Sequence, residues 1–395
     1  MIYHKLFGLI ARTVNLFTPI KEDLWVFGSD YGKSYREGSK YLLEYMVEKH
    51  PEIDCCFITQ SKGVYKELRE KGLPVELNTS WKGIIKTSQA KCVFTTQYTN
   101  DILFAYKKKG RKFYYLVHGQ PLKKSIFSLK GTTFGKKIAI KGNFLSTIKH
   151  KLSHYLSIGY RIQDVEFVSA TSEFLQPLME KDFGGYVPVK ILGMPRNDAL
   201  FQPYRFEKEK WLDNVDNKFI ITYMPTHRAY GNGCISPTPF QNRPEIQAWM
   251  REHNVILVVK NHPNMLKQCK SFYNSDCIID ITDKGIDPQV AIYHSDVLVT
   301  DFSSVWMDYL LLRRPIFFYI YDNFEQDDAG CHYDIRENPP GHFCYDEDEF
   351  FRLIQKAKKS YDKMKPKDEI IKKYHLYTDG RSCERYYQEI TSQTQ

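Results

Sequence analysis

The sequence predicts an α/β protein with two domains. Short apolar runs alternate with amphipathic stretches along most of the chain, as in βαβ units on a parallel sheet. A length of 395 residues exceeds one ordinary core and indicates two domains. The composition, 42% hydrophobic and 26% charged residues, is that of a globular protein and excludes a disordered chain.

Residues 1–20 predict a first amphipathic helix. Apolar residues recur there at helical spacing, together with two basic residues and no acid. The segment is too short to span a bilayer. It either packs on the core as an ordinary helix or lies in a membrane interface.

The first half then alternates strands with helices. Strands are predicted at 24–27, 55–59, 91–95, 113–117, 166–170 and 189–192, and helices at 41–49, 65–71, 153–159 and 172–181. The strand at 113–117 delivers His118 at its carboxyl end, where open α/β sheets bind ligands. An exposed imidazole there can accept a proton from a hydroxyl near neutral pH, although a lone histidine is more often structural.

The second half restarts after a polar stretch, 199–217, which we interpret as the crossing between domains. Its strands are predicted at 218–222, 255–260, 277–280, 297–299 and 315–319, and its helices at 243–252, 288–294, 305–312, 347–360 and 382–391. The predicted organisation is therefore one domain over 1–200, a second over 201–374, and a carboxyl-terminal helical segment over 375–395 that crosses back.

The apolar strand 297–299 ends in a hydroxyl-rich turn before a helix. Ser303 and Ser304 fall at the first helical turn, where free backbone N–H groups and the helix dipole favour an anion. Thr300 and Asp301 precede them, Asp301 as a cap or turn former, and Asp308 lies one turn into the helix. A capped strand–helix junction without a ligand is the alternative.

The charge and cysteine patterns limit the environment and the partners. The net charge is +9, and residues 119–163 contain eight lysines, one arginine and no acid. Nucleic acid, anionic lipid or a phosphate-rich polymer would each complement such a block. Nine cysteines without a C-x-x-C pair indicate buried free thiols in a reducing compartment. We find neither a spanning apolar run nor a signal peptide, and expect a cytoplasmic protein.

Other candidate residues also follow predicted strands or lie near the domain junction. Arg228 offers a planar fork for phosphate, and Arg196 either reaches a ligand or forms an inter-domain ion pair. His262 follows the predicted strand 255–260 and precedes a proline, as a turn residue does. The D-x-D at 346–348 directly precedes a predicted helix, so we interpret it as an N-terminal cap of that helix and not as a metal site. No cofactor is expected, since G-x-G-x-x-G and P-loop motifs are absent, and no metal is required, with Mg²⁺ left open.

Ordered motifs across residues 25–390 resemble the CDP-glycerol glycerophosphotransferase family of teichoic-acid and capsule polyol-phosphate transferases. They occupy 118–123 (HGQPLK), 193–198 (GMPRND), 225–228 (PTHR), 260–263 (KNHP), 296–309 (DVLVTDFSSVWMDY), 314–319 (RPIFFY) and 379–382 (DGRS). Gln120 departs from the family's usual threonine. The resemblance implies two Rossmann-like domains of glycosyltransferase-B type, with His118 as general base and His262 as a donor to the pyrophosphate.

The resemblance further implies transfer of glycerol phosphate or ribitol phosphate from CDP-glycerol or CDP-ribitol to a lipid-linked or polymeric acceptor. Arg228, Ser303 and Ser304 would hold the pyrophosphate. The acid-free run of lysines interleaved with apolar residues over 119–163, together with residues 1–20, predicts peripheral attachment to the inner face of an anionic membrane. Two alternatives remain: a UDP-sugar glycosyltransferase of the same architecture, and a non-enzymatic nucleic-acid binder. No recognised nucleic-acid motif is present, and the basic block alternates with apolar residues more than with stacking aromatics.

Overall fold

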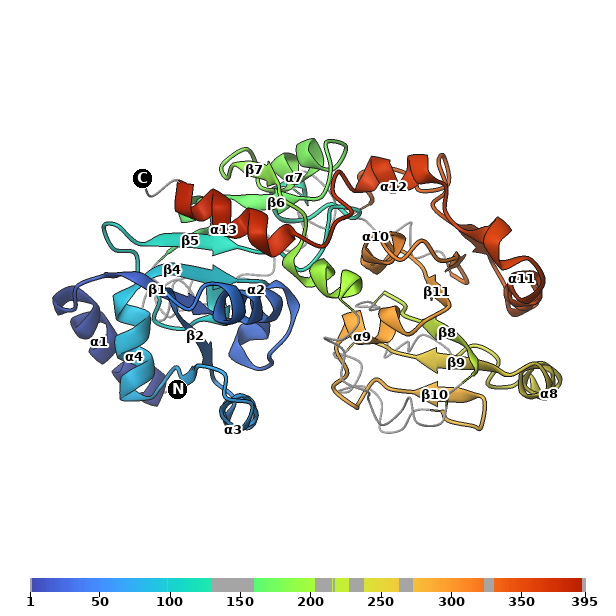
Figure 1. Cartoon of the computed structure of the whole chain (residues 1–395), viewed down its shortest axis with the longest axis horizontal. Coiled ribbons are helices and arrows are strands. Elements are labelled where there is room, and N and C mark those ends of the chain that lie inside the picture. Colours follow the sequence, from blue (N-terminus) through green and yellow to red (C-terminus); the bar gives the residue numbers. More distant parts are fainter. Residues whose placement is uncertain are drawn as a thin grey trace, which may run out of the picture. The chain divides into compact units, whose positions relative to one another are not determined.

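A computed structural model describes residues 2–97, 99–129, 160–202, 215, 217–226, 238–262, 273–322 and 330–392. The chain divides into two compact units (Figure 1). Unit 1 contains residues 1–120, 125–198 and 379–395, and unit 2 contains 121–124 and 199–378. Each unit carries a parallel sheet with helices, which confirms the predicted α/β class.

Unit 1 is built on a sheet with the order β3-β2-β1-β4-β5, in which all pairs are parallel. Its strands are β1 (Lys21–Phe27), β2 (Asp54–Thr59), β3 (Val75–Leu77), β4 (Ala90–Thr95) and β5 (Lys112–Tyr115). The chain reverses its direction of travel through the sheet between β1 and β4. Such a reversal leaves a crevice at the carboxyl ends of the strands. A second, two-stranded parallel sheet joins β6 (Val168–Ala170) and β7 (Val189–Ile191).

Unit 1 contains six α-helices among the described residues, two of them with serine caps. They are α1 (Ile2–Phe17), α2 (Glu37–Lys49), α3 (Lys62–Glu70), α4 (Trp81–Gln89), α7 (Gln176–Asp182) and α13 (Ser382–Ser392). Ser61 caps α3 by accepting the Val64 N–H, and Ser80 caps α4 by accepting the Gly83 N–H.

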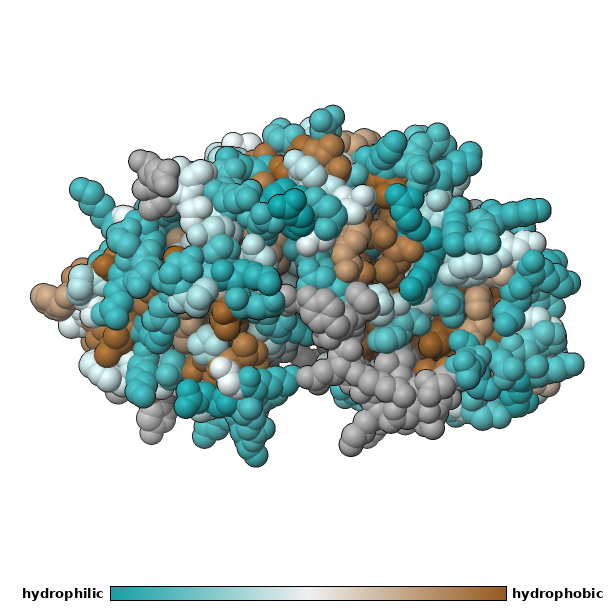
Figure 2. All heavy atoms as spheres, in the orientation of Figure 1, coloured by the Kyte–Doolittle hydropathy of each residue, from teal (hydrophilic) through white to brown (hydrophobic). Residues whose placement is uncertain are grey.

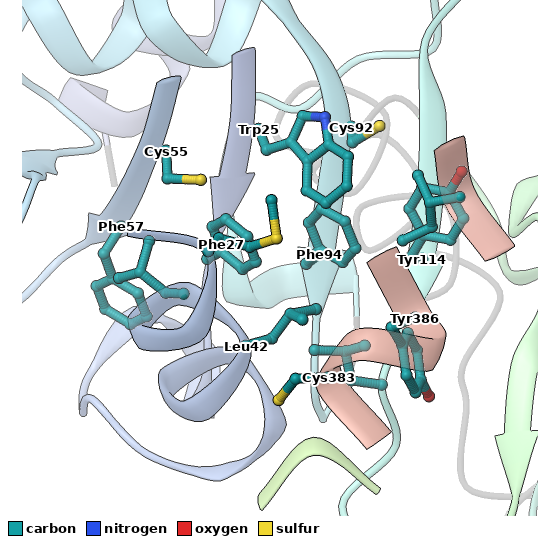
Figure 3. Close-up of a cluster of buried hydrophobic side chains, with 14 of the residues drawn as sticks. Trp25, Phe27, Leu42, Cys55, Phe57, Cys92, Phe94, Tyr114, Cys383 and Tyr386 are labelled. Carbon is teal, nitrogen blue, oxygen red and sulfur yellow. The ribbon is translucent and has the colours of Figure 1, made fainter. Parts of the chain in front are cut away.

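The last helix, α13, completes the core of unit 1 although it lies far away in sequence. Cys383 and Tyr386 pack with aromatic residues of β4 and β5 (Figure 3). Two of the sequence motifs meet here. Gly193, with φ +82°, lies so close to Ser382 that an added Cβ would be 2.4 Å from its Oγ. Asp198 accepts the N–H groups of Ser382 and Cys383 at 2.8 and 2.7 Å, which caps α13.

Unit 2 has the sheet order β10-β9-β8-β11-β12-β13, again entirely parallel. Its strands are β8 (Phe219–Tyr223), β9 (Val255–Val259), β10 (Ile278–Asp280), β11 (Val297–Thr300), β12 (Ile316–Tyr319) and β13 (His342–Cys344). Its helices are α8 (Pro244–Glu252), α9 (Pro288–Tyr293), α10 (Val305–Leu310), α11 (Glu347–Ser360) and α12 (Asp368–Tyr374). The reversal point in this sheet lies between β8 and β11.

Most predicted elements are present with shifts of a few residues at their ends. Four elements were missed: β3, α4, β13 and α12. The two missed strands have three residues each, too few to show an alternation. The predicted helix at 153–159 and most of the polar stretch 199–217 lie outside the described residues.

Six of the described cysteines are buried and free, as predicted. None of the described helices is long and apolar enough to cross a bilayer.

The cap on α13 yields a stability prediction. Asp198→Ala removes both acceptors and leaves two buried N–H groups unpaired, so the free energy of unfolding should fall by about 1–3 kcal/mol. Asp198→Asn keeps one acceptor and should lose less. Urea unfolding measures both, with Asp23→Ala at an exposed position of unit 1 as the control. Equal stability of Asp198→Ala and the parent would show that Asp198 does not hold α13.

Candidate active site

His118 follows β5 through a strained corner of the backbone. The strand was predicted to run to residue 117, but β5 ends at Tyr115. Val117 is buried and has φ +46°, a left-handed conformation that is unfavourable for a β-branched residue. The corner therefore turns the chain out of the sheet one residue before the imidazole, whose side chain is solvent exposed.

Two groups fix His118 in this position. The backbone of Thr96, just after β4, lies close enough to the imidazole to raise its pKa. The His118 carbonyl in turn accepts a hydrogen bond from Arg196 Nη1 at 2.6 Å. A neutral imidazole carries one N–H donor and one acceptor nitrogen, and the acceptor nitrogen can take up a proton.

The protein around His118 lowers the pKa of its imidazole from the ordinary value of 6.5. Loss of hydration in the surrounding protein is the largest cause, and the positive charge of Arg196 acts in the same direction. Glu37 and Asp101 oppose the shift through their negative charges. The residue thus keeps an accessible edge while the protein packed around it favours the neutral form of the ring, which is the state a general base requires.

Arg196 and Glu37 form a buried ion pair beside His118. Their side chains are 8% and 15% exposed, and Arg196 Nη1 bridges Glu37 Oε2 and the His118 carbonyl. Glu37 begins α2 and has φ +62°, a second left-handed residue close to the imidazole. Glu37 was not predicted from the sequence, because no spacing rule connects it to His118.

Asp101 organises the loop that holds the His118 ring. Its Oδ2 accepts the N–H groups of Thr96 and Gln97 at 2.8 and 2.9 Å, and its Oδ1 accepts the N–H of Tyr31 at 2.6 Å. These bonds tie the end of β4 to the loop after β1, on either side of the reversal point. Asp101 was also missed; its position shortly after a predicted strand is the only sequence signal.

Gln120, the departure from the family motif, has a structural role in unit 1. Its side-chain amide donates to the Ser169 carbonyl and accepts the Thr171 N–H, both at 3.1 Å. It therefore spans the end of β6. The next four residues belong to unit 2, where Leu122 accepts the His332 N–H at 2.8 Å and Lys123 pairs with Cys331.

In unit 2, Thr300 and Asp301 join the two strands at the reversal point. Thr300 Oγ1 donates to the Met224 carbonyl at 2.7 Å, after β8. Asp301 Oδ1 accepts the N–H and hydroxyl of Thr226 at 2.8 and 2.6 Å. Both side chains are buried, so they shape the loop that leads into α10.

Ser303 and Ser304 lie between this clamp and α10, and both are half-buried. Ser304 is the residue before the helix, and its hydroxyl caps no N–H group there. Asp308 lies on α10 and is 3% exposed, and its charge acts on His375, whose Nε2 lies 2.7 Å from the Met307 carbonyl. Asp308 is thus a buried member of the helix, whereas the two serines border solvent.

His262 follows β9 with its side chain exposed, directly after the buried residues Lys260 and Asn261. The Asn261 N–H bonds Thr282 Oγ1 at 2.9 Å, which fixes the backbone just before the histidine. Arg228 lies outside the described residues. The structure thus groups His118 with Arg196 in unit 1, and places Thr300, Asp301, Ser303, Ser304, Asp308 and His262 in unit 2.

A cavity of about 250 Å³ in unit 2 adjoins the serine loop. Its walls are Leu122, Phe302, Cys331, Tyr333, Asp334, Ile335 and Arg336. Arg336 pairs with Asp334 at 2.8 Å, which gives a mixed apolar and charged lining. Among the residues that the structure describes, no group of His, Cys, Asp and Glu side chains could hold a metal ion.

Comparison with known proteins identifies the family. The family model described as CDP-Glycerol:Poly(glycerophosphate) glycerophosphotransferase matches residues 10–392. A teichoic acid glycerol-phosphate primase of Bacillus subtilis is 31% identical over 224 residues, which cover 55% of each chain. A teichoic acid poly(glycerol phosphate) polymerase of Bacillus spizizenii is 25% identical over 90% of this chain and 88% of its own. The chain spans about half the length of several other curated relatives that it matches.

The fold is that of a solved relative. The structure of the wall teichoic acid polymerase TagF superposes with a TM-score of 0.73 at 19% identity, covering 99% of this chain and 94% of that one. This likeness confirms the predicted glycosyltransferase-B-type fold with two Rossmann-like halves. The family match extends over nearly the whole length, and the chain therefore belongs to the CDP-glycerol:poly(glycerophosphate) glycerophosphotransferase family.

Proposed function

We propose that this protein transfers glycerol phosphate or ribitol phosphate from CDP-glycerol or CDP-ribitol to a hydroxyl of a lipid-linked or polymeric acceptor, releasing CMP. The observation that carries the proposal is His118, in a member of this transferase family: an exposed residue that follows a strained corner, with its carbonyl held by Arg196 and the pKa of its imidazole lowered. That arrangement suits removal of a proton from an alcohol.

In the proposed reaction, the free nitrogen of His118 accepts the proton of the acceptor hydroxyl. The resulting oxygen attacks the phosphorus on the polyol side of the donor, and the bond to CMP breaks in line. Little covalent chemistry falls to the protein, so its contribution is positioning and charge stabilisation. Arg196 positions His118 through the backbone and does not itself contact substrate.

The donor is assigned to unit 2. Ser303 and Ser304 offer hydroxyls at the solvent-facing end of the clamped loop, and exposed His262 offers a ring N–H to the departing CMP. Arg228 supplies the guanidinium in this scheme. Thr300, Asp301 and Asp308 support the loop and the helix behind it. The proposed mechanism uses no metal ion, and a requirement for Mg²⁺ is the alternative.

The proposed location is the cytoplasmic face of the cell membrane, where a lipid-linked acceptor is reached from water. The acid-free block at residues 119–163 supports an anionic membrane surface as partner. Most of that block lies outside the described residues. A cytoplasmic location also agrees with the free, buried thiols.

The general-base role predicts a specific loss. His118→Ala should lower turnover with CDP-glycerol about 10²–10⁴-fold while donor affinity and folding stay unchanged. Release of CMP measures it, with CDP-ribitol and a UDP-sugar panel run in parallel to decide the donor. His253→Ala, a partly exposed histidine of unit 2, is the control. Near-full transfer by His118→Ala would remove this residue from the mechanism, and release of UDP alone would favour a sugar transferase.

The electrostatics of His118 predict a shift in pH dependence. The negative charge of Glu37 raises the pKa of the imidazole and the positive charge of Arg196 lowers it. Glu37→Gln removes the negative charge, so that the positive charge of Arg196 is no longer offset. The pKa of His118 should fall, and the acid limb of the kcat/KM profile should move to lower pH. Glu48→Gln, an exposed carboxylate on the same helix, should leave the profile in place. A shift to higher pH in Glu37→Gln would contradict the assignment.

The donor assignment predicts weaker binding in one unit. Ser304→Ala should weaken CDP-glycerol binding several-fold, since one neutral hydrogen bond contributes about 1 kcal/mol, and Arg228→Ala should weaken it more, because its bonds are charge-assisted. Calorimetry with His118→Ala protein avoids turnover. Ser360→Ala, at the end of α11, is the control. Unchanged affinity in both Ser304→Ala and Arg228→Ala would overturn the assignment of the donor to unit 2.

A further inference from the structure

Helix α1 carries a row of exposed apolar side chains. Leu9, Ile10, Leu16 and Phe17 are 59%, 36%, 76% and 82% exposed, and exposed Thr13 lies between the two pairs. Ile10, Leu16 and Phe17 follow Leu9 by one, seven and eight residues, and this spacing places all four on one face of the helix. Four of the twelve large hydrophobic residues exposed in the described part of the chain belong to this single helix. Brown surface appears at the left edge of Figure 2, where Figure 1 places α1.

The opposite face of α1 fixes which side is exposed. Ala11 is fully buried against Ile84 of α4, Phe104 and Tyr106, with Phe7 and Val14 beside it. The Tyr106 hydroxyl donates to the Gly8 carbonyl at 2.9 Å, and the Arg12 guanidinium lies 4.5 Å from the centre of the Tyr106 ring. The helix is thus packed on unit 1 and cannot turn its exposed row inward. The sequence allowed either a helix packed on the core or a helix in a membrane interface. One face of α1 has the contacts of the first, and its other face has the exposed apolar residues of the second.

Lysines border the exposed end of the row. Lys108 Nζ donates to the carbonyls of Asn15 and Thr18 at the end of α1, so the loop 107–110 lies beside Leu16 and Phe17. Lys107 and Lys109 are exposed there. Asp164 pairs with Lys107 and Glu22 pairs with Lys91, so the excess positive charge of this loop comes from Lys108 and Lys109. The surroundings of the row therefore carry net positive charge.

We infer that the exposed row of α1 and the lysines of the loop 107–110 dock unit 1 on an anionic lipid bilayer. Leu16 and Phe17 would enter the boundary between headgroups and acyl chains, and the lysines would contact the headgroups. The inference rests on the proposed membrane-linked acceptor and names the element that makes the contact.

A bilayer fits this face better than a second copy of the chain. Specific protein interfaces use roughly 20–30 residues a side, whereas this row has four apolar side chains. The lysine border and the net charge of +9 oppose pairing of identical copies. A shallow apolar row with a cationic border is the arrangement of helices that lie in a membrane interface.

The test is co-sedimentation of the full chain with vesicles of phosphatidylglycerol and phosphatidylcholine, and with phosphatidylcholine alone. Leu16→Glu/Phe17→Glu should lower binding to the anionic vesicles at least about tenfold, because two inserted apolar side chains become charged. Lys107→Gln/Lys109→Gln should weaken binding to anionic vesicles only. The matched control is Leu376→Glu/Tyr377→Glu, an exposed apolar pair in unit 2 that should bind like the parent.

Two further measurements and one milder variant separate loss of docking from loss of folding or of activity. Thermal unfolding shows whether the variants fold, and Phe17→Ser is a milder second change with the same expected direction. CMP release with a water-soluble acceptor should be unaffected in Leu16→Glu/Phe17→Glu, so a failure of the transferase function is separable from a failure of docking. Vesicle binding equal to that of the parent, or a parent dimer that this variant dissociates, would overturn the inference.

Discussion

The buried pair of Arg196 and Glu37 is the constraint on which the unit 1 site depends. Arg196 holds the carbonyl of His118, the residue that follows a valine in the left-handed region. Such a conformation costs about 1–3 kcal/mol and persists only where surrounding contacts determine it. The pair supplies such a contact, and Glu37, itself left-handed, is fixed by the same bond. Strain at two residues next to one imidazole is typical of a site in which orientation matters more than local stability.

Both units have the same aspartate–threonine hydrogen-bond arrangement at the reversal point of their sheets. In unit 1 a buried aspartate, Asp101, accepts the N–H and hydroxyl of Thr96 after β4. In unit 2 another buried aspartate, Asp301, accepts the N–H and hydroxyl of Thr226 after β8. Each carboxylate closes a loop at the end of a central strand, so that the exposed groups beside it, His118 in one unit and the two serines in the other, are held by rigid elements.

The sequence was sufficient to predict the fold class and most of the strands, but not the contacts that support the candidate site. Apolar runs and their periodicity located most strands, and the motif at 118–123 located His118. The roles of Gly193 and Asp198 were not predictable, because they depend on α13, nearly two hundred residues later. Glu37 was missed for the same reason, because its partner Arg196 is distant in sequence. Asp101 bonds Thr96 and Gln97 nearby, but its bond to Tyr31, which ties two strand ends together, joins distant parts of the chain. Asp308 follows a motif closely, yet its burial on α10 became visible only in the fold.

The central claim is that His118 is neutral at pH 7, so that one ring nitrogen carries a proton and the other can act as a base. Nitrogen-15 NMR of the histidine side chains, assigned by comparison with His118→Ala, measures this directly. The account predicts one protonated and one unprotonated ring nitrogen at pH 7, and a pKa below the ordinary 6.5. An imidazolium at pH 7, with a pKa above that value, would contradict it.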